Sequence, residues 1–213
     1  MFIDIHTHSF TVSGHSQSVV SLYEQLERSK QPGLYSIGLH PCFLQNAKLE
    51  DVKQWAVYER VLAIGECGLD KLSSFSMELQ QQAFYKQVLL ANEVQKPLII
   101  HCVRAFDEVL AVLKHARVPV IFHGFNKRQE LAKQLLDQGF YLSFGKILEQ
   151  ERMQKVIRSV PLTQLFLETD MADIGIETVY QLAANAYNVE LNSLSLQLQK
   201  NAITVFGEKI VQA

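Results

Sequence analysis

The chain has 213 residues, of which 48% are hydrophobic and 20% charged, and its formal net charge is -2 at pH 7. This composition is ordinary for a globular protein, and the near-neutral charge excludes a strongly basic surface that would coat nucleic acid. The three widely spaced cysteines argue against a disulfide framework, so we expect a cytoplasmic protein. Without a signal-peptide pattern, an apolar run of spanning length or a linker, we expect no membrane contact, no obligate protein partner and one domain over residues 1–213.

Short apolar segments alternate with longer segments of helical periodicity. In chain order, the predicted elements are the strands Phe2–Ile5, Leu34–Leu39 and Val61–Ile64, the helix Glu78–Val94, the strand Pro97–Ile100, the helix Phe106–His115, the strand Val118–Phe122, the helix Arg128–Gln138, the strand Phe140–Phe144, the helix Glu149–Val160, the strand Gln164–Leu167 and an all-helical tail, Ile174–Ala213. Alternating strands and helices predict parallel βα units, and nearly continuous apolar strands are typical of a sheet covered on both faces.

The turn after the first strand distinguishes between two α/β folds. A glycine-rich turn there would favour an open, doubly wound sheet that binds a nucleotide, whereas this chain has His6, Thr7, His8 and Ser9. We therefore predict a compact TIM-like (β/α) barrel with about seven to eight parallel strands, of which the eighth cannot be assigned.

The predicted strand ends carry the side chains that indicate a function. Active-site groups of a barrel lie at the carboxyl ends of its strands, and these ends carry His6, His8, His40, Glu66, His101, His123 and Asp170. Taken singly, each has a simpler explanation, as a hydrogen-bonded histidine or a helix-capping acid. Five of the seven histidines share this edge, however, and core packing does not explain that gathering, whereas a metal site does. His6 and His8 also point the same way from an extended strand.

Several neighbouring residues have two explanations or none that involves function. Asp70 either caps the next element or supports a ligand histidine. Glu168 shares the parity of Asp170, and it either supports a ligand or pairs with a basic neighbour. Strand alternation turns Cys67 and Cys102 away from the expected ligands, so we interpret both as buried hydrophobes. The acidic overall charge and the single tryptophan, Trp55, provide no obvious surface for stacking bases.

A family resemblance rests on ordered motifs, which read DIHTHSF, GLHP, IGECGLD, IIHCVRAFDEVL, HGF and LETD. In that order and spacing the chain resembles the TatD-type deoxyribonuclease family of the amidohydrolase superfamily, from Phe2 to about Asp170. The resemblance implies a metal-dependent hydrolase with a TIM-like barrel, typically active on nucleic-acid phosphodiesters. It also implies the ligands: His6, His8 and Asp170 for one ion, His101 and His123 for a second, and Glu66 as the bridge.

Such a ligand set suits ester hydrolysis by two divalent ions. Imidazole and carboxylate ligands do not choose between Mg, Mn and Zn. Two ions lower the pKa of a shared water and neutralise charge on the attacking and leaving oxygens. We expect a phosphodiesterase that acts on DNA ends through a metal-bridging hydroxide, with Asp170 and Glu66 as catalytic residues. Asp170 would accept the proton of the water and pass it to the leaving group.

Three residues are candidates for contacts with the substrate. His40 matches the histidine of the family's His-Pro turn, and it either bonds a phosphate or a bound water or is a turn residue locked by Pro41. Arg104 stands one position after the arginine that the family commonly has, and Lys127 replaces a glycine of the family pattern. Either could face an anionic substrate or simply be solvated.

The segment after Asp170 departs most from the family. The family normally continues with a proline-containing loop, whereas this chain is expected to enter a helix almost at once. Because the loops after the strands select the substrate, hydrolysis is better supported than deoxyribonuclease activity, and the expected partner is a nucleic acid or another phosphoester. Two alternatives stay open: an amidohydrolase-type enzyme for another small ester, amide or lactone, and a non-catalytic metal-binding relative.

Overall fold

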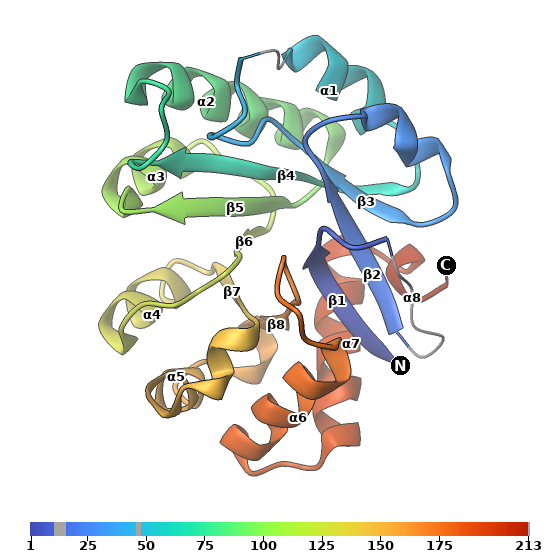
Figure 1. Cartoon of the computed structure of the whole chain (residues 1–213), viewed down its shortest axis with the longest axis vertical. Helices are drawn as coiled ribbons and strands as arrows, with labels where there is room; N and C mark the ends of the chain where they lie inside the picture. The colour runs from blue at the N-terminus through green and yellow to red at the C-terminus, as the bar shows by residue number, and fades with distance from the viewer. Residues whose placement is uncertain (11–15, 46–47, 213) are drawn as a thin grey trace. The chain divides into compact units, whose positions relative to one another are not determined.

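The computed structural model describes residues 1–10, 16–45 and 48–212, in which eight strands and eight α-helices alternate along most of the chain (Figure 1). The strands are β1 (Phe2–Thr7), β2 (Ser16–Leu22), β3 (Leu34–Ile37), β4 (Val61–Asp70), β5 (Leu98–Val103), β6 (Val120–Phe122), β7 (Tyr141–Phe144) and β8 (Leu165–Leu167). The α-helices are α1 (Leu49–Ala56), α2 (Met77–Val94), α3 (Phe106–Leu113), α4 (Gln129–Leu136), α5 (Glu151–Ile157), α6 (Ile176–Tyr187), α7 (Leu191–Phe206) and α8 (Lys209–Gln212). Short 3₁₀ helices are η1 (Leu26–Lys30), η2 (Lys146–Glu149) and η3 (Leu162–Gln164).

The strand order confirms the predicted fold class. The eight strands are neighbours in sequence order within one sheet, and the pairs β1–β2, β3–β4, β4–β5 and β7–β8 are parallel. A parallel bridge between Thr7 and Asp170 joins the end of β1 to the segment after β8. A sheet whose first strand meets its last has the topology of a (β/α) barrel.

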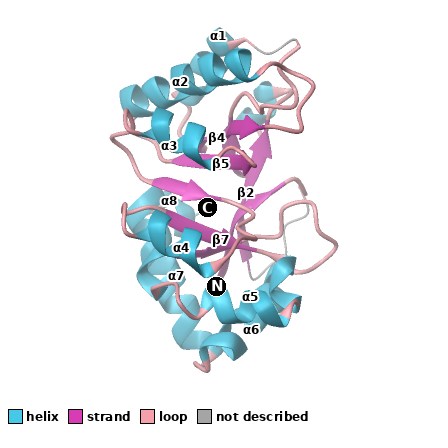
Figure 2. Cartoon of the chain, turned by 90° about the vertical axis from the view of Figure 1, so that its left-hand side faces the viewer, coloured by secondary structure: helices cyan, strands magenta, loops and turns pink. Residues whose placement is uncertain are grey.

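By its contacts the chain divides into two compact units, Met1–Val20 with Phe122–Ala213 and Ser21–Ile121, which we call the first and the second unit. In the first unit, α6 and α7 pack against β1 and β8, and α4 lies beside β7 (Figure 2). The buried residues of α6 include Ile176, Val179, Tyr180 and Ala183, and this spacing turns one face of the helix to the strands. The Tyr180 hydroxyl donates to the Ile3 carbonyl and accepts from the Ile3 N–H, both at 3.1 Å. Helix α6 thus provides hydrogen-bond partners for the backbone at the beginning of β1.

In the second unit, α2 covers β4 (Figure 1) and fixes two strand ends through buried glutamines. The Gln80 side chain accepts from the Asp70 N–H at 2.8 Å and donates to the Asp70 carbonyl at 3.1 Å. Gln87 does the same for the Leu39 N–H and carbonyl, at 2.7 and 3.2 Å. The helix begins at a capping residue, Ser76, whose side chain accepts from the Leu79 N–H at 3.3 Å. The carboxyl ends of β3 and β4 are therefore held in place by the same helix.

The boundaries differ from the sequence prediction mainly at two strands. β2 is the eighth strand that could not be assigned, because its first residues, Ser16, Gln17 and Ser18, are polar and give no apolar run. β4 continues to Asp70, well past the predicted end at Ile64, and all its residues are buried although polar residues and glycines interrupt the apolar pattern. The tail is helical as predicted, in three helices, and Ala213 lies outside the described residues. No helix among the described residues is long and apolar enough to cross a membrane.

Candidate metal centre

Three predicted ligands gather in the first unit, where β1 meets the segment after β8. Nε2 of His6 lies 3.7 Å, and Nε2 of His8 3.5 Å, from Oδ1 of Asp170. One donor atom from each of the three residues lies within 4.8 Å of the others. Two imidazoles with one carboxylate suit a divalent transition metal, so this group fits the ion that the resemblance implies.

The backbone places these ligands. The Asp170 N–H donates to the His6 carbonyl at 2.9 Å, and the His8 N–H donates to the Asp170 carbonyl at 3.2 Å. Asp170 itself adopts the left-handed conformation, with φ of 53°. The two histidines and the carboxylate therefore belong to one hydrogen-bonded ladder between chain segments that are far apart in sequence.

Asp4 is a buried carboxylate of this unit that the sequence analysis missed. Its Oδ2 accepts from the Thr169 hydroxyl at 2.6 Å, and its Oδ1 accepts from the Thr169 N–H at 3.1 Å. Burial raises the pKa of Asp4 to about 7, although these hydrogen bonds oppose the rise. Asp4 thus fastens β1 to the residue before Asp170. The signal in the sequence was its parity, which Asp4 shares with His6 and His8.

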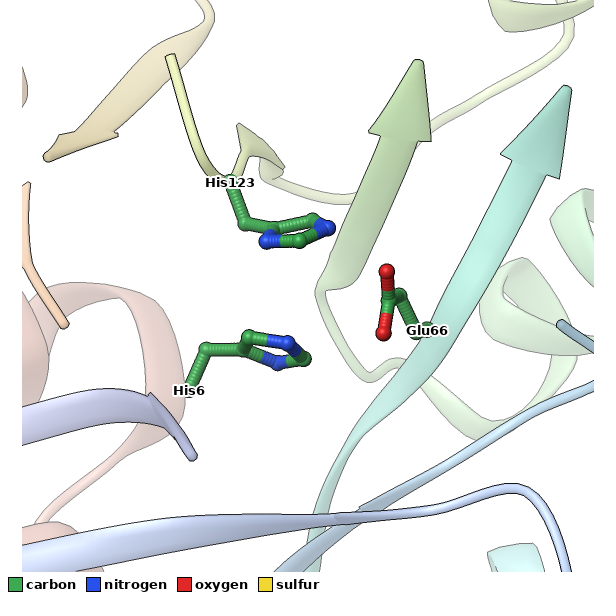
Figure 3. Close-up of side chains that lie close together, drawn as sticks. All are labelled: His6, Glu66 and His123. Carbon is green, nitrogen blue, oxygen red and sulfur yellow. The ribbon is translucent and has the colours of Figure 1, made fainter. Parts of the chain in front are cut away.

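His123, directly after β6, belongs to the same unit and is backed by Glu168. Figure 3 shows His6 on β1, His123 after β6 and Glu66 on β4; the ring centroids of His6 and His123 are 4.3 Å apart, and the ring planes are tilted by 44°. Nδ1 of His123 lies 3.5 Å from Oε1 of Glu168, which also accepts from the Gly124 N–H at 2.6 Å. Burial would raise the pKa of Glu168, but the contact with His123 holds it below its ordinary value. Glu168 therefore fits both explanations that the sequence left open. It supports a predicted ligand, His123, and the basic neighbour with which it pairs is that same histidine.

In the second unit, His101 on β5 lies between two carboxylates. Its Nδ1 is 2.7 Å from Oε1 of Glu66, and its Nε2 is 3.0 Å from Oδ2 of Asp70. A neutral imidazole has one N–H, so it can donate to just one of them, and the other nitrogen then needs a proton or a cation beside it. His101 and Glu66 would hold a cation, and Nε2–H would then donate to Asp70, which is the usual arrangement behind a metal-bound histidine.

Asp70 has both of the roles that the sequence left open. Besides His101, it accepts from the Leu72 N–H at 2.7 Å through Oδ1 and so caps the turn that follows β4. Burial would raise the pKa of Asp70, but hydrogen bonds from His101, the Leu72 N–H and Cys42 lower it below its ordinary value. The carboxylate is therefore ionised and available to orient the His101 ring.

The backbone N–H of Cys42 determines the tautomer in which His40 contacts Glu66. Nδ1 of His40 accepts from the Cys42 N–H at 3.0 Å, so the ring hydrogen is on Nε2, which lies 3.3 Å from Oε1 of Glu66. His40, Glu66 and His101 lie close enough together that they could hold one ion, so the expectation that His40 is not a ligand stays a prediction. Its contact with a substrate stays a prediction.

The other expectations have mixed outcomes. Cys67 is fully buried, as predicted, and burial raises the pKa of its thiol. The prediction for Cys102 was wrong: it is half-buried, because the last residues of β5 lie at the partly exposed end of the strand. Arg104 is exposed with φ of 56°, and Lys127 is half-buried just before α4, so their contacts with a substrate stay predictions. The pairing of His101 with His123, and Glu66 as the bridge, join residues of the two units and also stay predictions.

Comparison with known proteins assigns the family. A family model described as TatD related DNase matches residues 3–207. The chain belongs to the TatD family. This TatD-family chain is 34% identical over 145 residues to the uncharacterized metal-dependent hydrolase YcfH of Escherichia coli K12, in an alignment covering 64% of this chain and 55% of YcfH. Its identity to the uncharacterized metal-dependent hydrolase YabD of Bacillus subtilis 168 is also 34% over 145 residues, covering 63% of this chain and 57% of YabD.

The matched part of this TatD-family chain thus spans little more than half the length of these two relatives. A solved structure is matched over nearly its whole length. The crystal structure of YjjV, a TatD homolog from Escherichia coli K12, has a TM-score of 0.81 and 25% identity, with 96% of this chain and 97% of that chain covered. The structural likeness agrees with the barrel topology.

Proposed function

We propose that this chain is a divalent-metal-dependent hydrolase of phosphodiesters that removes nucleotides from DNA ends. The observation that carries the proposal is the grouping of His6, His8 and Asp170 within 4.8 Å, a set of donors that core packing does not require. Glu66 and His101 supply a second set of donors in the second unit. The family description, TatD related DNase, supports a nucleic-acid substrate.

The proposed cofactor is a pair of divalent ions, Mg, Mn or Zn. His6, His8 and Asp170 would hold one, His101 and His123 the other, and Glu66 both. When bound, such ions lower the pKa of a coordinated water and neutralise charge on the attacking and leaving oxygens of a phosphodiester. Three cysteines that form no disulfide support our placement of this activity in the cytoplasm.

The protein side chains divide the remaining work. The Asp170 side chain is 42% exposed, so a substrate can reach it, and we assign it the proton of the attacking water and its delivery to the leaving oxygen. Nε2 of His40 lies 3.3 Å from Oε1 of Glu66, and we assign His40 the orientation of that carboxylate. Asp70 and Glu168 hold the rings of His101 and His123 in the orientation that a cation needs.

The test uses protein freed of metal by chelation and reloaded with Mg, Mn or Zn. We expect about two ions per chain and release of terminal nucleotides from an end-labelled single-stranded oligonucleotide. Replacing the proton acceptor, in Asp170→Asn, should lower kcat by about 10²- to 10⁴-fold while the fold is kept. The control is Asp137→Asn, which changes an exposed carboxylate after α4 that pairs with Lys133 and should leave the rate unchanged.

Two results would contradict the proposal. Hydrolysis of lactones or carboxyl esters, with no cleavage of any phosphodiester under all three metals, would assign the site to another hydrolase. A near-normal rate in Asp170→Asn would remove this residue from proton transfer.

A further inference from the structure

Two aromatic side chains of the second unit stack on each other beside His40, the residue that contacts Glu66. Tyr23 directly follows β2, and Phe43 follows β3 by a short loop. Their ring centroids are 4.6 Å apart with an interplanar angle of 11°, which is a stacked pair. The Phe43 ring also lies 5.1 Å from the His40 ring, and His40 in turn contacts Glu66. One imidazole therefore separates this aromatic pair from a predicted metal ligand.

The turn that carries Phe43 is fixed in place. The Phe43 N–H donates to the His40 carbonyl at 3.0 Å, which closes a β-turn with Pro41 at its second position. The Ser73 hydroxyl donates to the Pro41 carbonyl at 2.8 Å and ties the turn to the segment after β4. The same turn thus sets both the His40 contact with Glu66 and the position of the Phe43 ring.

Phe43 keeps 39% of its surface exposed, although hydrogen bonds hold the turn that carries it. It lines a cavity of about 300 Å³ together with Tyr23, Leu39 and Trp55. Trp55 is already engaged, because the Lys30 ammonium lies 4.8 Å from its ring centroid and Tyr58 packs at 4.9 Å. Phe43 is therefore the ring of this cluster that can accept a flat ligand.

We propose that Tyr23 and Phe43 form a stacking platform for one base of the substrate, next to the phosphodiester that is cleaved. This inference rests on the proposed function, and it restricts the substrate class to nucleotides in place of phosphoesters in general. No obvious stacking surface was expected from a sequence with a single tryptophan, and we propose this aromatic pair in its place.

The charges around the cavity support a base as the occupant. Among the described residues that line it, Glu24, Glu27 and Asp51 carry negative charge and Lys48 positive charge. A phosphate would meet net repulsion there, whereas an uncharged ring would not. Bases stack on aromatic side chains with little sequence preference, since every base has a π face.

The test compares two single-stranded oligomers of equal length and charge. One is oligodeoxyadenylate, and the other carries an abasic tetrahydrofuran sugar at every position. For the metal-loaded protein we expect kcat/KM to be about 5- to 150-fold higher for the oligomer with bases, which is the range expected of one stacked base. Phe43→Ala should lose that preference, whereas Phe43→Trp should retain it.

Tyr85→Ala is the matched control, because Tyr85 is also 39% exposed and packs against His115, outside this cavity. A binding measurement uses metal-free protein with an oligonucleotide that contains 2-aminopurine. We expect its fluorescence to be quenched by wild type and Tyr85→Ala, and not by Phe43→Ala.

Equal rates on both oligomers, or a full base preference in Phe43→Ala, would overturn the platform while leaving the hydrolase intact. Failure of the proposed function is distinguishable, because in that case neither oligomer is cleaved by wild type.

Discussion

At the scale of single residues, each unit contains a histidine whose ring is backed by a buried carboxylate. Asp70 contacts Nε2 of His101, and Glu168 contacts Nδ1 of His123. Such partners fix the tautomer and orientation of a ligand, and their loss typically costs about 10- to 100-fold in metal affinity. The nitrogen left for a cation is therefore Nδ1 in His101 and Nε2 in His123.

We predict that Asp70→Asn lowers the metal affinity of the His101 position by about 10- to 100-fold, because an amide no longer holds Nε2–H as a charged acceptor does. The measurement is a competition titration with a chromophoric chelator. Asp137→Asn, at an exposed ion pair with Lys133, should bind metal like wild type. Unchanged affinity in Asp70→Asn would show that the carboxylate serves the turn after β4 alone.

The sequence predicted individual site residues unevenly. His6, His8 and Asp170 could be predicted because strand ends and parity place side chains at one edge. The same rules left Asp70 and Glu168 with two explanations each, since parity gives the face of a strand and not the neighbour across it. Phe43 could not be predicted, because stacking on Tyr23 depends on the path of two loops.

At the scale of elements, a glycine sets how closely β4 approaches β5. Gly68 pairs with His101, and its φ is 142°, a value that L side chains rarely adopt. A Cβ at this position would overlap the His101 carbonyl oxygen. Because His101 and Glu66 come from these two strands, the spacing of the pair depends on the missing side chain.

We predict that Gly68→Ala lowers the free energy of unfolding by about 2 to 4 kcal/mol, from backbone strain and displacement of β5. Chemical denaturation of the metal-free protein measures it. The control is Gly175→Ala, because an added Cβ there meets nothing within 4 Å and φ is -76°. If Gly68→Ala unfolded like the wild type, as we expect of Gly175→Ala, the close approach of β4 to β5 would make no difference to the free energy of unfolding.

The elements that the sequence predicted least well are β2 and β4. Both depart from a continuous apolar run: β2 begins with polar residues, and β4 contains Glu66 and Asp70. The polar residues of β4 are buried because they meet His40 and His101, so the pattern that hid the strand is a consequence of the site. Helices α2 and α6 were predictable because an apolar stripe and, in α2, a capping serine mark them.

At the scale of the whole molecule, the two units are interleaved in sequence. The second unit, Ser21–Ile121, is inserted into the first. Strand β2 runs from one unit into the other, and so does β6. No shift in composition marks either crossing, which is why we predict one domain, and that prediction stays open.

We predict one cooperative thermal transition, because neither unit can unfold without disrupting a strand that it shares with the other. Calorimetry of the chelated protein should give a calorimetric enthalpy equal to the van't Hoff enthalpy. Chelation matters, because a bound ion would raise Tm by mass action and could broaden the peak. Two resolved peaks would mean that the units unfold as separate domains.

The ladder between β1 and Asp170 has a consequence for how the protein is made. Thr7 and Asp170 are 163 positions apart, so a ribosome delivers both histidines of the DIHTH segment long before the aspartate that completes their set. Until then the nascent chain contains two of the three proposed ligands. If this set holds an ion as proposed, metal loading at this position has to follow the synthesis of the segment after β8.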